Sequence, residues 1–256
     1  MKKFFLILLM AALSLTSSAQ NRRVADMLEL PAYSNTKSYK VVFHKAYTTS
    51  FSPKHKIPNW VAWKLTKKHV ETVTYKREYN YRYDPQLGRD ICPDSDDYKH
   101  SGYDRGHMCP AADNRWDKVA MSECDYMSNM CPQKHELNGG KWEGLEGRCR
   151  NWAKQYGSIY VVCGPVLPEN HARKRLDSGI TVPEKFYKAV LRKDRKGNYY
   201  VIGYLFDQKN NYKVLSIDEI ERMIGVDLFP KVPDHIERRI ESKVDTSNWQ
   251  HWDKIN

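Results

Sequence analysis

Runs of β-branched and aromatic residues recur along this chain, and they constrain its fold more than any other feature. Such runs are typical of β-strands when turn-forming residues bound them. We predict six strands, at residues 39–47, 59–66, 69–79, 158–166, 185–193 and 198–207. Gly197 and Asn198 lie where the last run begins, which indicates a hairpin turn between the last two strands.

Two segments have the pattern of helices. In residues 137–156, large side chains recur at helical spacing: Trp142, Leu145, Cys149 and Trp152. A second helix is predicted to begin after Ser216, which caps it, with Glu219 completing a capping box and Gly225 ending the helix. Several strands with few, dispersed helices predict an α+β fold, in which helices flank a mostly antiparallel sheet.

The first residues have the pattern of a secretory signal. Lys2 and Lys3 precede an apolar run at residues 4–15, and small residues follow, so we predict cleavage after Ala19. The run is shorter than the ~20 residues of a transmembrane helix, although an uncleaved anchor is the alternative. No later segment has the length and hydropathy to cross a bilayer. We therefore expect a secreted or periplasmic bacterial protein that has no membrane attachment once the signal is removed.

Residues 20–256 are predicted to form one domain, because no Gly/Ser linker, repeat or low-complexity block divides them. Its core is expected at about residues 39–232. The segment from Pro233 onward is polar, and we expect it to pack loosely.

The charge of the chain is strongly basic, at +11, or +9 once Lys2 and Lys3 leave with the signal. A basic exported protein is drawn to polyanions such as nucleic acid, anionic lipid or acidic glycans, and charge alone does not choose among them. A solvated basic surface with no polyanionic partner is the alternative.

Six cysteines remain after the signal, and an even number in an exported chain predicts disulfides. The sequence does not select among the fifteen pairings that six cysteines allow. Cys163 lies in an apolar run, where a free buried thiol is the alternative. No CxxC pair is present, which disfavours a zinc ribbon.

The tetrapeptide Asp104-Arg105-Gly106-His107 carries the groups that phosphodiester cleavage requires. His107 is a natural general base because its ordinary pKa lies near neutrality. Arg105 offers a fork of donors suited to phosphate oxygens. Gly106 would let the backbone turn tightly and let a substrate approach. A polar turn with a hydrogen-bonded histidine is the alternative.

Asn138 and Glu146 are candidates for a metal site. A neutral amide oxygen suits a Mg²⁺ ion that keeps most of its waters, and suits zinc poorly. Glu146 lies eight positions later, a rise of ~12 Å in an unbroken helix. Either Asn138 precedes the helix, or Glu146 acts through a metal-bound water. The alternatives are a helix cap for Asn138 and a solvent-facing charge for Glu146.

Several blocks of the chain, in order and spacing, resemble the DNA/RNA non-specific endonucleases. The blocks are SGYDRGHMCPAAD, MSNMCPQ, LNGGKWEGLE and YVVCGP. The similarity covers roughly residues 75–206. It implies a ββα-metal active-site motif on a six-stranded antiparallel sheet. Met108 and Cys109 depart from it, since small apolar residues are usual after the histidine, and a disulfide at Cys109 or Cys131 would pin the metal loop.

The resemblance also implies a role for each candidate residue. His107 would be the general base, and Asn138 the only direct protein ligand of a hydrated Mg²⁺, for which Mn²⁺ substitutes. Glu146 would hold a metal-bound water, Arg105 would stabilise the phosphorane, and Asn129 would support the site. A second family arginine matches Arg77 best, with Arg82 as the stand-in. Asp104 is expected to orient the turn.

The expected reaction is hydrolysis of DNA and RNA with little sequence preference, leaving 5′-phosphate ends. Two other readings stay open: a basic nucleic-acid-binding or adhesion protein that does not cut, and a zinc protein that uses His107 with nearby cysteines. The sequence also leaves open a homodimer, a protein inhibitor and the biological role.

Overall fold

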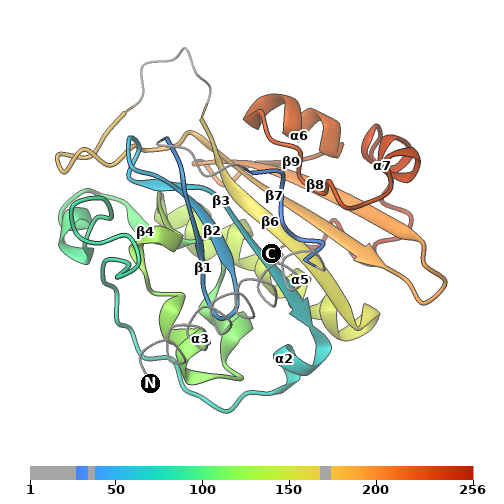
Figure 1. Cartoon of the computed structure of the whole chain (residues 1–256), viewed down its shortest axis with the longest axis horizontal. Helices are drawn as coiled ribbons and strands as arrows, with labels where there is room; N and C mark the ends of the chain where they lie inside the picture. The colour runs from blue at the N-terminus through green and yellow to red at the C-terminus, as the bar shows by residue number, and fades with distance from the viewer. Residues whose placement is uncertain (1–26, 34–37, 168–173, 256) are drawn as a thin grey trace, which may run out of the picture.

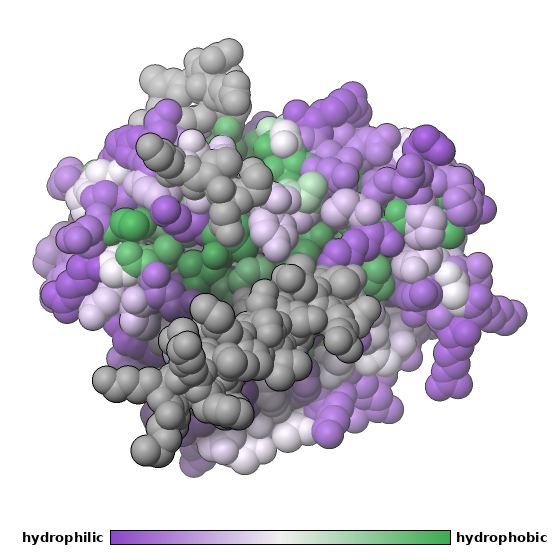
Figure 2. All heavy atoms as spheres, in the orientation of Figure 1, coloured by the Kyte–Doolittle hydropathy of each residue, from purple (hydrophilic) through white to green (hydrophobic). Residues whose placement is uncertain are grey.

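The computed structural model describes residues 27–33, 38–167 and 174–255 (Figure 1). The predicted signal segment, residues 1–19, lies outside these ranges. Within them, no helix has both the length and the apolar character needed to span a membrane. On the face drawn in Figure 2, the described surface is largely hydrophilic, and hydrophobic residues gather in a band near its middle.

An antiparallel sheet of seven strands forms the centre of the described part of the chain (Figure 1). Its strands, in spatial order, are β1 (Lys40–Phe43), β2 (Thr48–Ser52), β3 (Ile57–Thr66), β6 (Ser158–Val166), β7 (Lys185–Lys193), β8 (Tyr199–Asp207) and β9 (Tyr212–Leu215). The α+β class is confirmed, with seven strands where six were expected. The predicted hairpin joins β7 to β8, and Gly197 adopts the positive φ of 88° that its turn requires.

The predicted strand at residues 69–79 is wrong. Helix α2 (Lys67–Glu71) begins directly after β3, because the Thr66 side chain accepts a hydrogen bond from the His69 amide. The chain then runs outside the sheet, where the amides of Thr74 and Tyr75 donate to the Arg115 carbonyl. β-branched composition alone did not reveal that β3 ends in a helix cap.

A second, two-stranded sheet and the helix after it form a ββα unit. Its elements are β4 (Asp104–His107), β5 (Met130–Gln133), α4 (His135–Leu137), the π-helical turn η4 (Asn138–Trp142) and α5 (Glu143–Tyr156). The helix predicted at 137–156 is therefore interrupted, since Gly140 has the non-helical angles φ −108° and ψ −125°. Between β4 and β5 lie a short helix, α3 (Lys118–Glu123), and the 3₁₀ turns η2 (Ala111–Asn114) and η3 (Met127–Asn129); η1 (Ser95–Tyr98) precedes β4.

The two faces of the main sheet carry different layers. Side chains alternate along β7, so Phe186 and Val190 pack towards the ββα unit, and Tyr187 and Ala189 pack towards the opposite face. Helices α6 (Ile217–Ile224) and α7 (Asp234–Glu241) cover that opposite face (Figure 1). The predicted cap of α6 is confirmed: Ser216 and Glu219 form a capping box, and Gly225 ends the helix with φ 67°.

The polar C-terminal segment packs more tightly than predicted. It forms α7, and Trp249 and Ile255 further on are buried in the core. The indole of Trp152 on α5 donates to the Gln250 carbonyl at 2.8 Å. Two apolar anchors and hydrogen bonds to its backbone hold a segment whose composition predicts loose packing.

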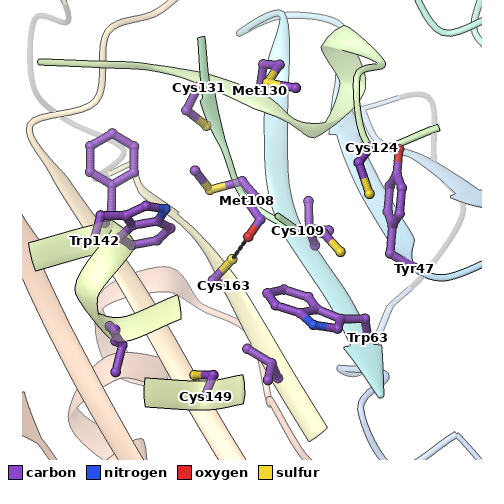
Figure 3. Close-up of a cluster of buried hydrophobic side chains, with 14 of the residues drawn as sticks. Tyr47, Trp63, Met108, Cys109, Cys124, Met130, Cys131, Trp142, Cys149 and Cys163 are labelled. Carbon is purple, nitrogen blue, oxygen red and sulfur yellow. Dashed lines mark hydrogen bonds between the residues drawn. The ribbon is translucent and has the colours of Figure 1, made fainter. Parts of the chain in front are cut away.

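All six cysteines are described, and each is a free, buried thiol. The predicted disulfides are therefore not formed in the structure. Figure 3 places five of them in the core between the main sheet and the ββα unit: Cys109, Cys124, Cys131, Cys149 and Cys163. Burial raises the pKa of Cys163 to about 12, and its thiol donates to the Met108 carbonyl at 3.3 Å. The alternative of a buried free thiol is confirmed for Cys163.

Candidate active site

His107 ends strand β4, where two other elements fix its backbone. It pairs with Met130 of β5, and its carbonyl accepts a hydrogen bond from the Trp142 indole at 3.0 Å. The side chain is 16% exposed and lines an open pocket of about 500 Å³. The ββα unit thus presents the imidazole, partly buried, at the edge of a cavity.

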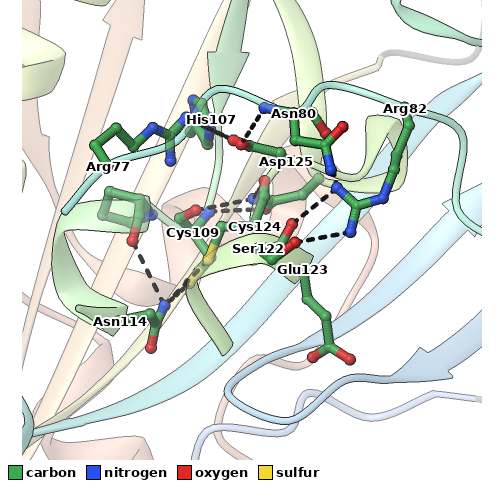
Figure 4. Close-up of polar contacts among 12 residues, drawn as sticks. Arg77, Asn80, Arg82, His107, Cys109, Asn114, Ser122, Glu123, Cys124 and Asp125 are labelled. Atoms are coloured by element: carbon green, nitrogen blue, oxygen red, sulfur yellow. Dashed lines mark hydrogen bonds and ion pairs between the residues drawn. The ribbon is translucent and has the colours of Figure 1, made fainter. Parts of the chain in front are cut away.

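A buried carboxylate and an arginine meet the imidazole of His107 (Figure 4). The Nε2 atom of His107 lies 3.1 Å from Oδ1 of Asp125 and 3.1 Å from Nη2 of Arg77. Arg77 donates to the same Asp125 oxygen at 2.5 Å. Burial lowers the pKa of His107, the charge of Arg77 lowers it further, and the bond to Asp125 opposes both. The neutral imidazole is therefore favoured at neutral pH.

Asp125 is a site residue that the sequence reasoning missed. Burial acts to raise its pKa, but hydrogen bonds from His107 and the Asn80 amide, with the charge of Arg77, hold that pKa below its usual value. Asp125 is thus an anion at neutral pH. Nothing in its local sequence links it to His107, eighteen positions earlier; only the fold brings them together.

Asn138 lies at the start of the interrupted helix, with its amide group oriented. Its Nδ2 donates to Oδ2 of Asp104 at 3.0 Å, and the same oxygen lies 2.8 Å from Nδ1 of His135. This geometry leaves the amide oxygen of Asn138 as the group available to a cation. It also agrees with the expectation that Asp104 orients the turn.

The turn between β8 and β9 supports the loop that carries Asn138. Gln208 accepts a hydrogen bond from the Lys134 amide at 2.7 Å, and Asn210 accepts one from the Lys141 amide at 2.8 Å. A Cβ atom at Gly140 would lie only 2.7 Å from the Asn210 side chain, so a larger residue there would displace Asn210 and its hydrogen bond with the Lys141 amide. A distant part of the chain therefore fixes both ends of this loop.

Glu146 lies on the first turn of α5 and is 9% exposed. Burial raises its pKa to about 7, against the opposing charges of Lys188 and Arg150. The ammonium of Lys188 lies 4.0 Å from Oε1 of Glu146 and 4.0 Å from the ring centre of Trp142. Lys188 was missed from the sequence, although a lone charge within the apolar run 186–191 was the available signal.

The pocket brings four of the predicted site residues together: Arg77, His107, Asn138 and Glu146 all line it. The break at Gly140 separates Asn138 from α5. Asn138 and Glu146 therefore do not lie on one unbroken helix, which would hold them too far apart to serve one ion. An amide oxygen and a carboxylate are hard donors, so the residues present fit a hydrated Mg²⁺. Among the described residues, no group of three His, Cys, Asp or Glu ligand atoms forms around His107, which counts against the zinc reading.

The two other arginines lie outside the residues that line this pocket. Arg105 donates to the Ser95 carbonyl at 2.7 Å and stacks 5.3 Å from the Tyr81 ring centre. Arg82 donates to the Ser122 hydroxyl at 3.0 Å (Figure 4). The geometry therefore favours Arg77 over Arg82 as the second arginine.

Asn129 and Gly106 serve the backbone rather than the cavity. Asn129 is fully buried; its amide nitrogen donates to the carbonyls of Cys109 and Cys124, and its oxygen accepts from the Cys109 amide. It thus supports the segment after His107 without reaching the pocket. A Cβ atom at Gly106 would overlap the side chain of Gln133, so this glycine makes room for Gln133, and the expectation that it admits substrate is wrong.

A histidine on a short β-pair, facing an oriented asparagine where the next helix begins, defines a ββα-metal nuclease type of fold and site. The model of the DNA/RNA non-specific endonuclease family matches residues 28–235, and the chain belongs to this family.

The relatives agree with that assignment. The chain is 33% identical over 217 residues to a nuclease of Nostoc sp., covering 78% of this chain and 76% of the relative. It is 31% identical over 207 residues to the mitochondrial nuclease EXOG of Xenopus laevis, covering 73% of this chain but 57% of the relative. The chain spans 60% of the length of the zebrafish (Danio rerio) EXOG. A crystal structure of the EndoG/EndoGI complex contains a chain with the same fold, at a TM-score of 0.72 and 24% identity, over 84% of this chain and 94% of that one.

Proposed function

We propose that this protein is a Mg²⁺-dependent endonuclease that hydrolyses phosphodiester bonds of DNA and RNA with little sequence preference and leaves 5′-phosphate ends. One observation carries the proposal: His107, Arg77, Asn138 and Glu146, from four separate segments, line a single pocket. This hydrolysis needs three kinds of group at one phosphate: a general base, a positively charged side chain and donors that bind a metal ion.

His107 is the general base of the proposed reaction. Its Nε2 atom faces Asp125 and Arg77, which leaves Nδ1 to accept a proton from the attacking water. Because burial lowers its pKa, the imidazole is neutral and ready to accept that proton at neutral pH. Arg77, beside it, offers positive charge to the phosphate as negative charge builds up.

Asn138 and Glu146 are the residues that would hold Mg²⁺. Asp104 fixes the Asn138 amide so that its oxygen points away from the hydrogen bond. A bound Mg²⁺ supplies positive charge at the scissile phosphate and at the leaving oxygen. Burial raises the pKa of Glu146, and the charge of Lys188 beside it opposes that effect. Lys188 therefore favours the carboxylate form of Glu146.

The proposed substrate contacts are with the nucleic-acid backbone and with stacked bases. Lys76 and Arg115 line the pocket beside Arg77, and basic side chains there suit phosphates of either nucleic acid. The ring of Tyr79 is 76% exposed at the same pocket, with Arg77 4.9 Å from its centre. An exposed aromatic ring can stack on any base, which agrees with low sequence preference and with action on RNA as well as DNA.

The proposal places the protein outside the bacterial cytoplasm, secreted or in the periplasm. The basic, apolar and small-residue pattern of residues 1–19 supports this location. EndoG is bound by EndoGI in the structure with the same fold. A homodimer and a protein inhibitor of this chain remain proposals.

The test is to incubate the purified protein with circular plasmid and with RNA, in Mg²⁺ and in EDTA. We expect nicking and linearisation of the closed circle in Mg²⁺ alone, and a rate at least ~100-fold lower in His107→Ala. Asn138→Ala should lose activity at low Mg²⁺. Slower migration of plasmid without cutting would instead support a nucleic-acid-binding protein.

The choice between the two arginines has its own test. Arg77→Met should slow cleavage ~100-fold, because it removes charge from the pocket. Arg82→Met should cut within a few-fold of the unaltered protein, since Arg82 binds Ser122 instead. Equal losses in the two variants would contradict this assignment.

A further inference from the structure

Five carboxylates gather where α6 and α7 lie side by side, on the sheet face opposite the active site (Figure 1). Asp218 and Glu221 lie on α6, Asp227 follows that helix, and Glu237 and Glu241 lie on α7. Residues three or four apart share one side of a helix, so the two acids of each helix lie next to each other. In a chain of net charge +11, this is a local concentration of negative charge.

Among the residues that the structure describes, no basic side chain pairs closely with these carboxylates, and one of them, Glu241, is buried. Glu241 is 2% exposed, and its Oε1 atom is buried with no hydrogen-bond partner in the described part of the chain. The buried Oε1 of Glu237 has none there either. In the same ranges, no Lys or Arg nitrogen lies within 4.0 Å of any of the five carboxylates. Arg238 acts on Glu237 only from a longer distance.

Burial and mutual repulsion both act on the carboxylates of this cluster. Burial raises the pKa of Glu241 to about 9, and Glu221, Glu237 and Asp227 add to the effect. The pKa of Glu221 rises to about 7, again mainly through burial. A cation bound among these carboxylates would supply the opposite charge that the described residues do not place beside them.

Three of the carboxylates have the spacing of a cation site. One oxygen from each of Asp218, Glu221 and Glu241 lies within 4.8 Å of the other two. When three atoms lie this near one another, a single point exists within about 2.8 Å of all three. An ion at that point would be only slightly farther from each oxygen than the 2.3–2.6 Å of a Ca²⁺–oxygen bond. Mg²⁺ needs shorter bonds and strict octahedral geometry, so it fits less well. Glu241 also ends α7, where the helix dipole favours positive charge.

We propose that Asp218, Glu221 and the unpartnered Glu241 bind a structural divalent cation, best matched by Ca²⁺, between α6 and α7. The ion is separate from the catalytic centre and does not depend on the proposed nuclease function. It ties α7 to α6, and through both helices to β8. Its role is to stabilise the C-terminal layer of the protein.

The experiment is thermal unfolding of the full chain after removal of metal with EDTA, with and without millimolar Ca²⁺. We expect Ca²⁺ to raise the Tm by about 5 °C, since an ion that binds only the folded state stabilises it. The double variant Glu221→Gln with Glu241→Gln should lose this shift. Without metal its own Tm should be higher, because the repulsion is gone. A merely structural role for these acids predicts no response to Ca²⁺.

Two controls separate this site from the active centre. Asn138→Ala, which removes the proposed catalytic ligand, should keep the full Ca²⁺ shift and bind one Ca²⁺ in calorimetry. Glu71→Gln, an exposed acid on α2, should keep it as well. The proposal is overturned if metal-free protein shows neither a shift nor calorimetric binding, or if both persist in the double variant. Plasmid cutting is scored separately, so failure of either proposal leaves the other intact.

Discussion

The two faces of the main sheet each bury acidic side chains beside a helix, and they differ in what neutralises them. On the active-site face, Glu146 of α5 has the ammonium of Lys188 at 4.0 Å and the charge of Arg150 nearby. On the other face, Glu221 and Glu241 have only other carboxylates among their strongest charged neighbours. Burial raises the pKa of both Glu146 and Glu221 to about 7.

The difference shows that burial alone does not decide what a carboxylate does. Burial disfavours the charged form in both places. At Glu146, a lysine placed on the inward side of β7 offsets that effect without blocking the pocket. At α6 and α7, the described residues supply no such positively charged side chain, so positive charge has to come from protons or from a bound ion. Four measurements on three variants test this contrast.

Lys188→Met should have the largest effect. Without the ammonium, the pKa of Glu146 rises above about 7 and the acid becomes protonated at neutral pH. We expect plasmid cleavage at pH 7 to fall about 100-fold, with partial recovery at pH 9. Lys185→Met, an exposed position on the same strand, is the matched control. Wild-type rates in Lys188→Met would mean that the two faces do not differ in the way described.

The variant Asp125→Asn tests whether a neighbouring charge shifts the pKa of His107, as Lys188 shifts the pKa of Glu146. The bond to Asp125 raises the pKa of His107, so its loss should lower that pKa further. Because the base must be neutral, activity is lost as pH falls through this pKa, and the acid limb of the pH–rate profile should move to lower pH. The rate should also drop about 10-fold through lost positioning. Asp96→Asn, at an exposed site, is the control; an acid limb that moves upward contradicts the assignment.

Glu241→Gln should have no effect on cleavage and a clear effect on stability. In EDTA at pH 8, we expect the free energy of unfolding to rise by about 2 kcal/mol, because the variant no longer buries an unpaired acid. Chemical denaturation measures this difference. A loss of stability of the same size would show that the Glu241 carboxylate has a stabilising partner.

The difference in the free energy of unfolding between Glu241→Gln and the unaltered protein should be smallest at low pH. Burial raises the pKa of Glu241 to about 9 in the folded protein, so it keeps its proton up to that pH, whereas in the unfolded chain it loses the proton near its ordinary pKa of 4.5. The folded state therefore binds more protons, and its stability falls as pH rises through that range. The advantage of Glu241→Gln over the unaltered protein should shrink to nearly nothing at pH 4 to 5. A constant difference across pH would point to packing instead.

Much of the fold and part of the site were predictable from particular residues. The β-branched runs at 158–166, 185–193 and 198–207 became β6, β7 and β8, and the cap at Ser216 became the start of α6. Strand β4 is the polar tetrapeptide at 104–107, and its composition gave no sign of a strand. The strand predicted at 69–79 was wrong for the converse reason. Its composition is typical of a strand, but the cap at Thr66 ends β3 and begins helix α2 there.

The sequence by itself determined the class of fold and the family, and it supplied the histidine and asparagine of the proposed site, because these depend on local spacing and short motifs. The tertiary structure decided which charges meet: Asp125 with His107, Lys188 with Glu146, and the acids of α6 with those of α7. Electrostatic effects act through space and depend on burial, and neither separation in space nor burial is written in the order of residues along a chain.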